Sequence, residues 1–174
     1  MISRALLVID MQRGIMDDKT YVLEYQDELF SIVNQAIDLA RKHLIPILFV
    51  QHSEYEGLVE FSSAWQLDYR LHKKDEDYVF SKWHSDAFWD TSLLSYLTQH
   101  KLQQLIICGV QTEYCIDTTL RSAHRLGYQP ILISNGHSTI NSESLSAQQI
   151  IDHHNRTLSS FSQVLSLDQI KFDE

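Results

Sequence analysis

Residues 104–133 read QLIICGVQTEYCIDTTLRSAHRLGYQPILI, and this stretch decides the fold. Its opening run, Gln104–Val110, is apolar enough to predict a buried strand. A helix follows with Thr112 as its N-cap, and it carries three apolar residues on one face: Ile116, Leu120 and Ala123. Pro130–Ile133 predicts the next strand. Two apolar strands joined by a helix are typical of a parallel sheet covered by helices on both faces.

The same alternation extends from this unit toward both ends of the chain. Short apolar runs predict further strands at Ala5–Ile9, Ile45–Val50, Tyr78–Phe80 and Val164–Leu167. Helical spacing predicts helices at Leu23–Lys42, at Ser92–His100, and from a capping box at Ser146 onward. We therefore predict a single α/β domain over residues 1–174, in which six strands alternate with helices.

The composition limits the classes of function. A formal net charge of −9 over 174 residues argues against general nucleic-acid binding, because phosphates require a positive field. No apolar run approaches the roughly 20 residues of a membrane-spanning helix, and the first residues do not have the layout of a signal peptide. Two cysteines do not make a disulfide framework. We expect a cytoplasmic protein that acts on a small molecule and contacts neither membranes nor nucleic acids.

In a parallel sheet, ligands bind at the carboxyl ends of the strands, so the residues just after each strand matter most. Cys115 follows the strand Gln104–Val110 and stands in the first turn of the next helix. The unpaired N–H groups and the dipole at a helix start favour a thiolate, which is the nucleophilic form of cysteine. The alternative is a small buried core residue, which is how most free cysteines behave. Cys108, in the middle of the strand, is predicted to be a packing residue.

Two further polar residues are predicted at the same edge of the sheet. Asp10 ends the first strand, where it could act as a base or cap the following turn. Lys82 follows the strand Tyr78–Phe80, where an ordinary solvent-exposed lysine is the alternative. An acid, a lysine and a cysteine at one sheet edge are less easily explained by chance than any one of them alone.

Four segments resemble the isochorismatase-like family of cysteine hydrolases, which includes nicotinamidases and N-carbamoylsarcosine amidases. Residues 7–12, LVIDMQ, are similar to the opening motif of the family, and Lys82 with residues 85–88, SDAF, resembles its lysine segment. Residues 109–123, GVQTEYCIDTTLRSA, resemble the nucleophile segment throughout, and residues 153–158, HHNRTL, resemble a motif near the C-terminus. The resemblance runs from about residue 4 to residue 167.

The resemblance implies a three-layer α/β/α, Rossmann-like fold with a six-stranded, mostly parallel sheet. It also implies a catalytic triad of Asp10, Lys82 and Cys115. A non-proline cis peptide bond is expected between Val110 and Gln111, with an oxyanion hole built from the backbone N–H groups of Gln111 and Cys115. In the implied mechanism, Asp10 takes the thiol proton, Lys82 stabilises both anions, and the thiolate attacks a carbonyl carbon to give a thioester.

The family's nicotinamidases carry Asp-x-His after the second strand and bind a metal there. The matching residues 50–54 read VQHSE, in which the acid and the histidine are not in that order. We therefore predict neither nicotinamidase activity nor a bound metal or other cofactor. The alternative is a metal site formed by His52, Glu54 and His72, since all three are of ligand types.

The substrate is not encoded in a recognisable motif. The polar and aromatic stretch His52–Asp77 is predicted to be a long loop, and long ordered loops are often functional. Residues placed to line the substrate pocket are Gln12, Trp83 and Phe88, with Trp65 and Trp89 close by. The last predicted helix carries three polar residues without an assigned role, which could serve the core, the pocket or a neighbouring subunit: His153, His154 and Asn155.

The leading hypothesis is a hydrolase that cleaves the C–N bond of a small amide or ureide. One alternative is a vinyl-ether hydrolase of the isochorismatase type, although such enzymes generally lack the cysteine. Another is a protein that keeps the fold only to bind a ligand, which the intact triad argues against. Members of the family are often oligomers, so we expect a homodimer or homotetramer.

Overall fold

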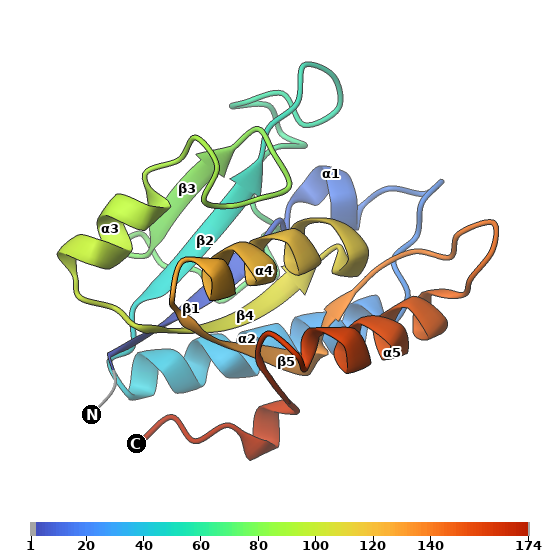
Figure 1. Cartoon of the computed structure of the whole chain (residues 1–174). Helices are drawn as coiled ribbons and strands as arrows, with labels where there is room; N and C mark the ends of the chain where they lie inside the picture. The colour runs from blue at the N-terminus through green and yellow to red at the C-terminus, as the bar shows by residue number, and fades with distance from the viewer. Residues whose placement is uncertain (1–2, 174) are drawn as a thin grey trace.

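Six strands form one all-parallel sheet in the computed structural model, which describes residues 3–173 (Figure 1). The strands are β1 (Arg4–Ile9), β2 (Ile47–His52), β3 (Tyr78–Lys82), β4 (Gln104–Val110), β5 (Gln129–Ser138) and β6 (Gln163–Leu165). Their order across the sheet is β3-β2-β1-β4-β5-β6. The second and third strands thus lie on one side of β1, and the last three strands lie on its other side. The carboxyl ends of β1 and β4 therefore flank the crevice where such sheets bind ligands.

The helices lie on both faces of the sheet, as predicted. They are α1 (Arg13–Met16), α2 (Gln26–Lys42), α3 (Leu93–Gln99), α4 (Asp117–Arg125) and α5 (Ala147–Leu158), together with a π-helical turn, η1 (Thr112–Ile116), and a 3₁₀ turn, η2 (Leu167–Gln169). The side chains of α2 pack with one face of the sheet, whereas those of α3 and α4 pack with the other. The three-layer α/β/α arrangement with a six-stranded parallel sheet is confirmed.

The central strands are buried because they are apolar on both sides. In β1, alternate residues belong to the two cores: Leu6 and Val8 face α2, and Leu7 and Ile9 face the layer of α3 and α4. Burial on both faces explains why these strands are continuous apolar runs rather than alternating ones.

Several boundaries differ from the sequence-based predictions. β5 is ten residues long and ends at Ser138, whereas the predicted strand ended at Ile133. The polar residues of its second half continue the sheet beside β4. Lys82 is the last residue of β3 rather than a residue after it, and it pairs with His52 of β2. The short helix α1 was not predicted. The segment between β2 and β3 contains no helix or strand, as expected, and it touches the loop after β1 through a bridge between Gln12 and Leu67.

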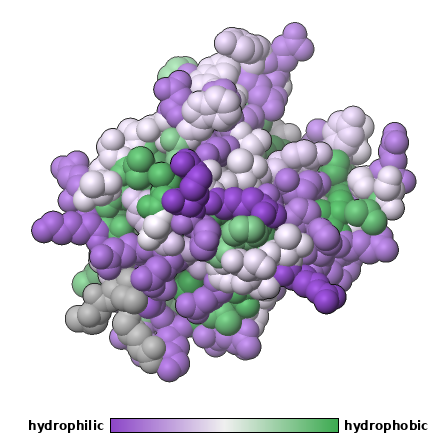
Figure 2. All heavy atoms as spheres, in the orientation of Figure 1, coloured by the Kyte–Doolittle hydropathy of each residue, from purple (hydrophilic) through white to green (hydrophobic). Residues whose placement is uncertain are grey.

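The surface is that of a mostly hydrophilic molecule. Figure 2 shows apolar residues as separate patches among hydrophilic ones on the face seen in Figure 1. Among residues 3–173, no helix combines the length and the apolar character needed to cross a membrane.

Candidate active site

Three strand ends bring Asp10, Lys82 and Cys115 together. Lys82 is fully buried, and its Nζ lies 2.7 Å from Asp10 Oδ2 and 3.2 Å from Cys115 Sγ. The residues come from the ends of β1 and β3 and from the turn after β4, so only the sheet order makes them neighbours. A protonated Lys82 can donate to both partners at once, which keeps the carboxylate and the sulfur on either side of one positive charge.

Lys82 has a third partner that the sequence did not assign to it. Its Nζ lies 3.0 Å from His52 Nδ1, and His52 Nε2 lies 3.4 Å from Glu54 Oε1. Burial, followed by the charge of Lys82, lowers the pKa of His52 below its ordinary value. His52 is therefore neutral, and its Nδ1 accepts a hydrogen bond from the ammonium group.

Asp10 is held in an uncommon backbone conformation. Its φ is 54°, in the left-handed region that a residue with a side chain rarely adopts, and its side chain is almost fully buried. Asp10 Oδ1 is buried without a hydrogen-bond partner among the described residues, whereas Oδ2 receives Lys82. Strained residues and unpaired buried oxygens are concentrated at functional sites, and Asp10 is both.

Gly109 lets β4 approach β1 just before the nucleophile segment. Its φ is +120°, and a Cβ on this residue would lie 2.1 Å from the backbone oxygen of Ile9. The register between β4 and β5 also shifts between Ile107 and Gly109. The peptide bond between Val110 and Gln111 is cis. Only glycine permits this close contact, which brings the residue before Asp10 against the strand that leads to Cys115.

Cys115 is less acidic than its place in the chain suggested. Burial and, next, the negative charge of Asp10 raise its pKa to about 12, although Lys82 opposes this rise. In the free protein, burial and the charge of Asp10 therefore act against the thiolate that the helix start was expected to favour. The thiol needs a base, and the Asp10 carboxylate lies within 4.8 Å of the sulfur. Cys108 is fully buried in β4, as predicted, and burial raises the pKa of its thiol too.

The N-cap prediction for Thr112 is also wrong. Thr112 is the first residue of η1, Gln111 holds the cap position, and no side chain caps that turn. The Thr112 hydroxyl instead lies 2.8 Å from Nδ1 of the buried His137. It is unavailable as a cap because it serves this contact with β5.

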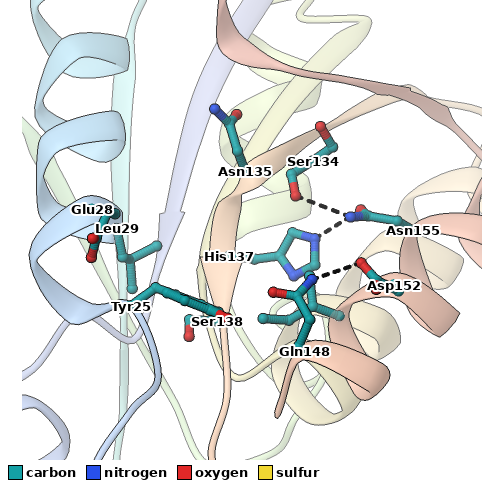
Figure 3. Close-up of a pocket in the computed structure, with 11 residues that line it drawn as sticks. Tyr25, Glu28, Leu29, Ser134, Asn135, His137, Ser138, Gln148, Asp152 and Asn155 are labelled. Atoms are coloured by element: carbon teal, nitrogen blue, oxygen red, sulfur yellow. Dashed lines mark hydrogen bonds between the residues drawn. The ribbon is translucent and has the colours of Figure 1, made fainter. Parts of the chain in front are cut away.

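A network behind the nucleophile turn joins β5 and α5 (Figure 3). His137 Nε2 lies 2.9 Å from Asn155 Oδ1, and Asn155 Nδ2 donates to the backbone oxygen of Ser134 at 3.0 Å. The Asn155 oxygen must then accept from His137 Nε2, which leaves His137 Nδ1 to accept from the Thr112 hydroxyl. Burial lowers the pKa of His137 to about 4, so the ring is neutral and suited to this arrangement.

Asn155 thus has a structural role that its sequence motif did not disclose. Its two neighbours have other surroundings: His154 Nδ1 lies 2.8 Å from the backbone oxygen of Ile150, and His153 is exposed on α5. The cavity of 230 Å³ that Figure 3 shows lies between α2, β5 and α5 and does not include Asp10, Lys82 or Cys115.

A larger cavity, of 670 Å³, opens directly onto the cysteine. Its lining includes Asp10, Gln111 and Cys115, together with side chains from the loops after β1, β2 and β3. Gln12, Trp83 and Phe88, which were expected to line the substrate pocket, are not among the residues that line this cavity. The Gln12 side chain is buried and donates to the backbone oxygens of His52 and Trp65. Phe88 packs in the core, and the exposed Trp83 packs against Tyr55.

The metal site considered for His52, Glu54 and His72 does not form in the described structure. His72 lies 3.0 Å from Asp38, and its side chain is not in the cavity with His52 and Glu54. The described residues do place ligand atoms of Asp10, His52 and Cys115 within 4.8 Å of one another. The ammonium group of Lys82 contacts all three, so the centre of this group is already filled by a cation of the protein itself.

Comparisons with known proteins agree with this geometry. The sequence model of the family described as "Isochorismatase domain" matches residues 4–169. A solved structure described as an isochorismatase family protein superposes with a TM-score of 0.90 at 42% identity, over 94% of this chain and 98% of that one.

Two curated relatives are similar at lower identity. The uncharacterized isochorismatase family protein YwoC of Bacillus subtilis is 26% identical over an alignment of 155 positions, gaps included, and the alignment covers 80% of this chain and 79% of YwoC. The nicotinamidase of Escherichia coli is 26% identical over an alignment of 179 positions, gaps included, and the alignment covers 79% of this chain and 84% of that enzyme.

Proposed function

The chain belongs to the isochorismatase family of hydrolases, and we propose that it is a cysteine hydrolase that cleaves the C–N bond of a small amide or ureide through a thioester. The observation that carries this proposal is the contact of one buried ammonium group, Lys82 Nζ, with both Asp10 and Cys115 at the base of an open cavity. The name of the Escherichia coli relative, nicotinamidase, is that of an amide-cleaving enzyme, which supports the same class of bond.

The first half-reaction starts from a neutral thiol. Asp10 takes the proton of Cys115, and the thiolate sulfur forms a bond with the carbonyl carbon of the substrate. The developing oxyanion is stabilised by the backbone N–H groups of Gln111 and Cys115. When the C–N bond breaks, Asp10 returns its proton to the departing nitrogen, and a thioester remains on Cys115. Lys82 stays protonated throughout and offsets the negative charge of whichever partner is ionised.

The second half-reaction returns the enzyme to its starting state. Asp10 takes a proton from a water molecule, whose oxygen attacks the thioester carbonyl in the same oxyanion site. The C–S bond breaks, the carboxylic acid leaves, and the sulfur regains a proton from Asp10. The sum is one amide and one water consumed for one acid and one amine or ammonia released. The scheme requires no cofactor.

The test is a screen of small primary amides and ureides with ammonia detection, run beside a vinyl-ether substrate with pyruvate detection. We expect ammonia release that Cys115→Ala lowers at least about 1,000-fold, because a covalent route is removed. Cys108→Ala is the matched control and should retain turnover, since Cys108 lies in the sheet core. A thioester adduct on the peptide that contains Cys115, detected by mass spectrometry after acid quench, would support the intermediate. Pyruvate release that survives Cys115→Ala would overturn the proposal in favour of the vinyl-ether reaction.

A further inference from the structure

The catalytic cavity has an uneven charge. Its lining includes the carboxylates of Asp18 and Glu54 in addition to Asp10, and it contains no lysine or arginine among the described residues. The charge of Asp10 is offset by Lys82, which lies beneath the cavity floor and is fully buried. The charges of Asp18 and Glu54 remain, so the cavity that leads to Cys115 is acidic.

Neither carboxylate pairs with a lysine or an arginine among the described residues. Asp18 Oδ1 accepts the backbone N–H groups of Thr20 at 2.7 Å and Tyr21 at 3.1 Å, which orients the carboxylate but leaves its charge uncompensated. Glu54 lies 3.4 Å from His52, and the lowered pKa of His52 keeps that ring neutral. The guanidinium group of Arg70 lies 2.9 Å from Asp68 and 3.9 Å from Asp17, the neighbour of Asp18 in the chain.

A second observation points to a ligand that carries N–H groups. Asp10 Oδ1 is a buried oxygen on the cavity floor that lacks a hydrogen-bond partner in the described residues. A bound amide or amine nitrogen can satisfy it, whereas a carboxylate oxygen there would be repelled. The floor of the cavity therefore favours a ligand nitrogen that carries N–H groups, and the carboxylates of its walls favour a positive charge.

The mouth of the cavity adds two aromatic rings. Tyr21 and Tyr114 both line the cavity and are 60% and 55% exposed. Exposed rings beside uncompensated carboxylates can stack against an ammonium or guanidinium group, since the ring face attracts cations.

We propose that the substrate is a cation: a small amide or ureide that bears an ammonium or guanidinium group, which Asp18 and Glu54 bind while the carbonyl lies at Cys115. The placement of the carbonyl at Cys115 rests on the proposed function. The preference for a positive charge rests only on the carboxylates that line the cavity. Anionic substrates are disfavoured by the same two carboxylates. Asp18 and Glu54 are thus substrate-binding residues that determine specificity, and neither takes part in bond cleavage.

The charge preference can be measured without knowing the substrate. Methanethiosulfonate reagents of similar size transfer either an ethyltrimethylammonium or an ethylsulfonate group to a thiol, and the methyl reagent serves as a neutral standard. The rates at Cys115 are followed by mass spectrometry of its peptide, and the cation-to-anion rate ratio is divided by the same ratio for free 2-mercaptoethanol. We expect a normalised ratio of about 10 or more at low salt, which decreases at 0.5 M NaCl because salt screens exposed charges.

The variants locate the source of the preference. Asp18→Asn combined with Glu54→Gln should lower the normalised ratio at least threefold, and the rates of the two charged reagents are each divided by the rate of the neutral reagent on the same variant. The charge-matched control is Asp75→Asn combined with Glu76→Gln, which removes two exposed acids just before β3, at the opposite edge of the sheet from Cys115. The control should leave the ratio unchanged.

Every outcome decides the proposal. A ratio near 1, a ratio unaffected by the Asp18 and Glu54 changes, or a Cys115 that none of the three reagents reaches would overturn it. Failure of the proposed function is visible separately, because it is read from ammonia release and the Cys115→Ala variant. Once turnover is found, 6-aminohexanamide against hexanamide is the matched pair of a cationic and a neutral substrate, and the double variant should raise KM for 6-aminohexanamide more than KM for hexanamide.

Discussion

At the scale of single residues, the ammonium group of Lys82 determines what the site can do. It is fully buried and lies within 3.2 Å of an oxygen, a nitrogen and a sulfur that belong to three different residues. A buried cation of this kind is tolerated because its partners compensate for the lost hydration. The carboxylate of Asp10 depends on Lys82 in turn, so the two charges stabilise or destabilise the protein as a pair.

The Lys82→Met variant should therefore lose both turnover and stability. It leaves the Asp10 charge buried and unpaired, for which we expect a loss of about 3–5 kcal/mol in the free energy of unfolding. Adding Asp10→Asn should restore much of that stability without restoring turnover. Urea unfolding and the ammonia assay measure the two effects, and Lys74→Met, at an exposed site, is the control. If Lys82→Met kept near-normal turnover, the triad would be refuted even with an essential Cys115.

The raised pKa of Cys115 leads to an unusual expectation for Asp10→Asn. Because the charge of Asp10 helps to raise the pKa of the thiol, its removal should lower that pKa and increase the thiolate fraction at pH 8. Alkylation of Cys115 by iodoacetamide should then be faster in Asp10→Asn than in the unaltered protein, although turnover is abolished. Cys108 should stay unlabelled in both, because it is fully buried. Slower alkylation would mean that Asp10 already deprotonates Cys115 before the substrate binds.

At the scale of elements, the connection from β4 to η1 positions the nucleophile. Gly109 lies where β4 passes closest to Ile9, and the turn that carries Cys115 begins three residues later. Behind that turn, His137 of β5 and Asn155 of α5 support Thr112. The nucleophile is thus positioned by two neighbouring strands and by one helix from the end of the chain.

Gly109→Ala is expected to prevent folding or to lower stability by several kcal/mol. The added Cβ meets the backbone of Ile9 at 2.1 Å, which backbone atoms cannot relieve without moving β1 from β4. Gly127→Ala is the matched comparison, because Gly127 also has a positive φ, of +89°, but nothing lies within 4 Å of its new Cβ. It should cost only about 1 kcal/mol. Equal effects of the two changes in thermal unfolding would contradict the close approach of the strands.

The neutral His137 predicts a loss of stability in acid. Its pKa is about 4 in the folded protein and 6.5 ordinarily, so between these values the unfolded chain binds more protons than the folded one. Stability should therefore decrease as the pH falls from 6.5 to 4, by on the order of 3 kcal/mol from this residue. In His137→Gln the protein should be less stable at pH 7 but should lose less on acidification. His153→Gln, on the exposed face of α5, should follow the unaltered protein, as urea titrations at several pH values can show.

At the scale of the whole molecule, self-association is the expectation that follows from the family resemblance. Tyr55, Phe61, Tyr69 and Trp89 are each more than 60% exposed, so an interface that covered them would bury large side chains. We expect a homodimer or homotetramer, which light scattering after size-exclusion chromatography would measure at several concentrations. A monomer at all concentrations would contradict this expectation.

The fold and the three central residues could be predicted because they depend on local signals. Continuous apolar runs mark strands that are buried on both faces, and Asp10, Lys82 and Cys115 stand at or just beyond the ends of such runs. The contact of His52 with Lys82 could not be predicted, because it depends on the parallel pairing of β2 with β3. The effect of burial on the Cys115 thiol could not be predicted for a related reason: the helix start is visible in the sequence, but the burial that raises the pKa of the thiol is a property of the packed molecule.

The position of β3 has a consequence for how the protein loses activity. β3 is an edge strand, held in the sheet by β2 alone, and Lys82 is its last residue. Edge strands open more readily than central ones, in local fluctuations that leave the remaining core intact. Each such opening withdraws the ammonium group from Asp10 and Cys115. Heat inactivation is therefore expected to begin below the temperature of global melting, and amide hydrogens of β3 should exchange with solvent sooner than those of β1 and β4.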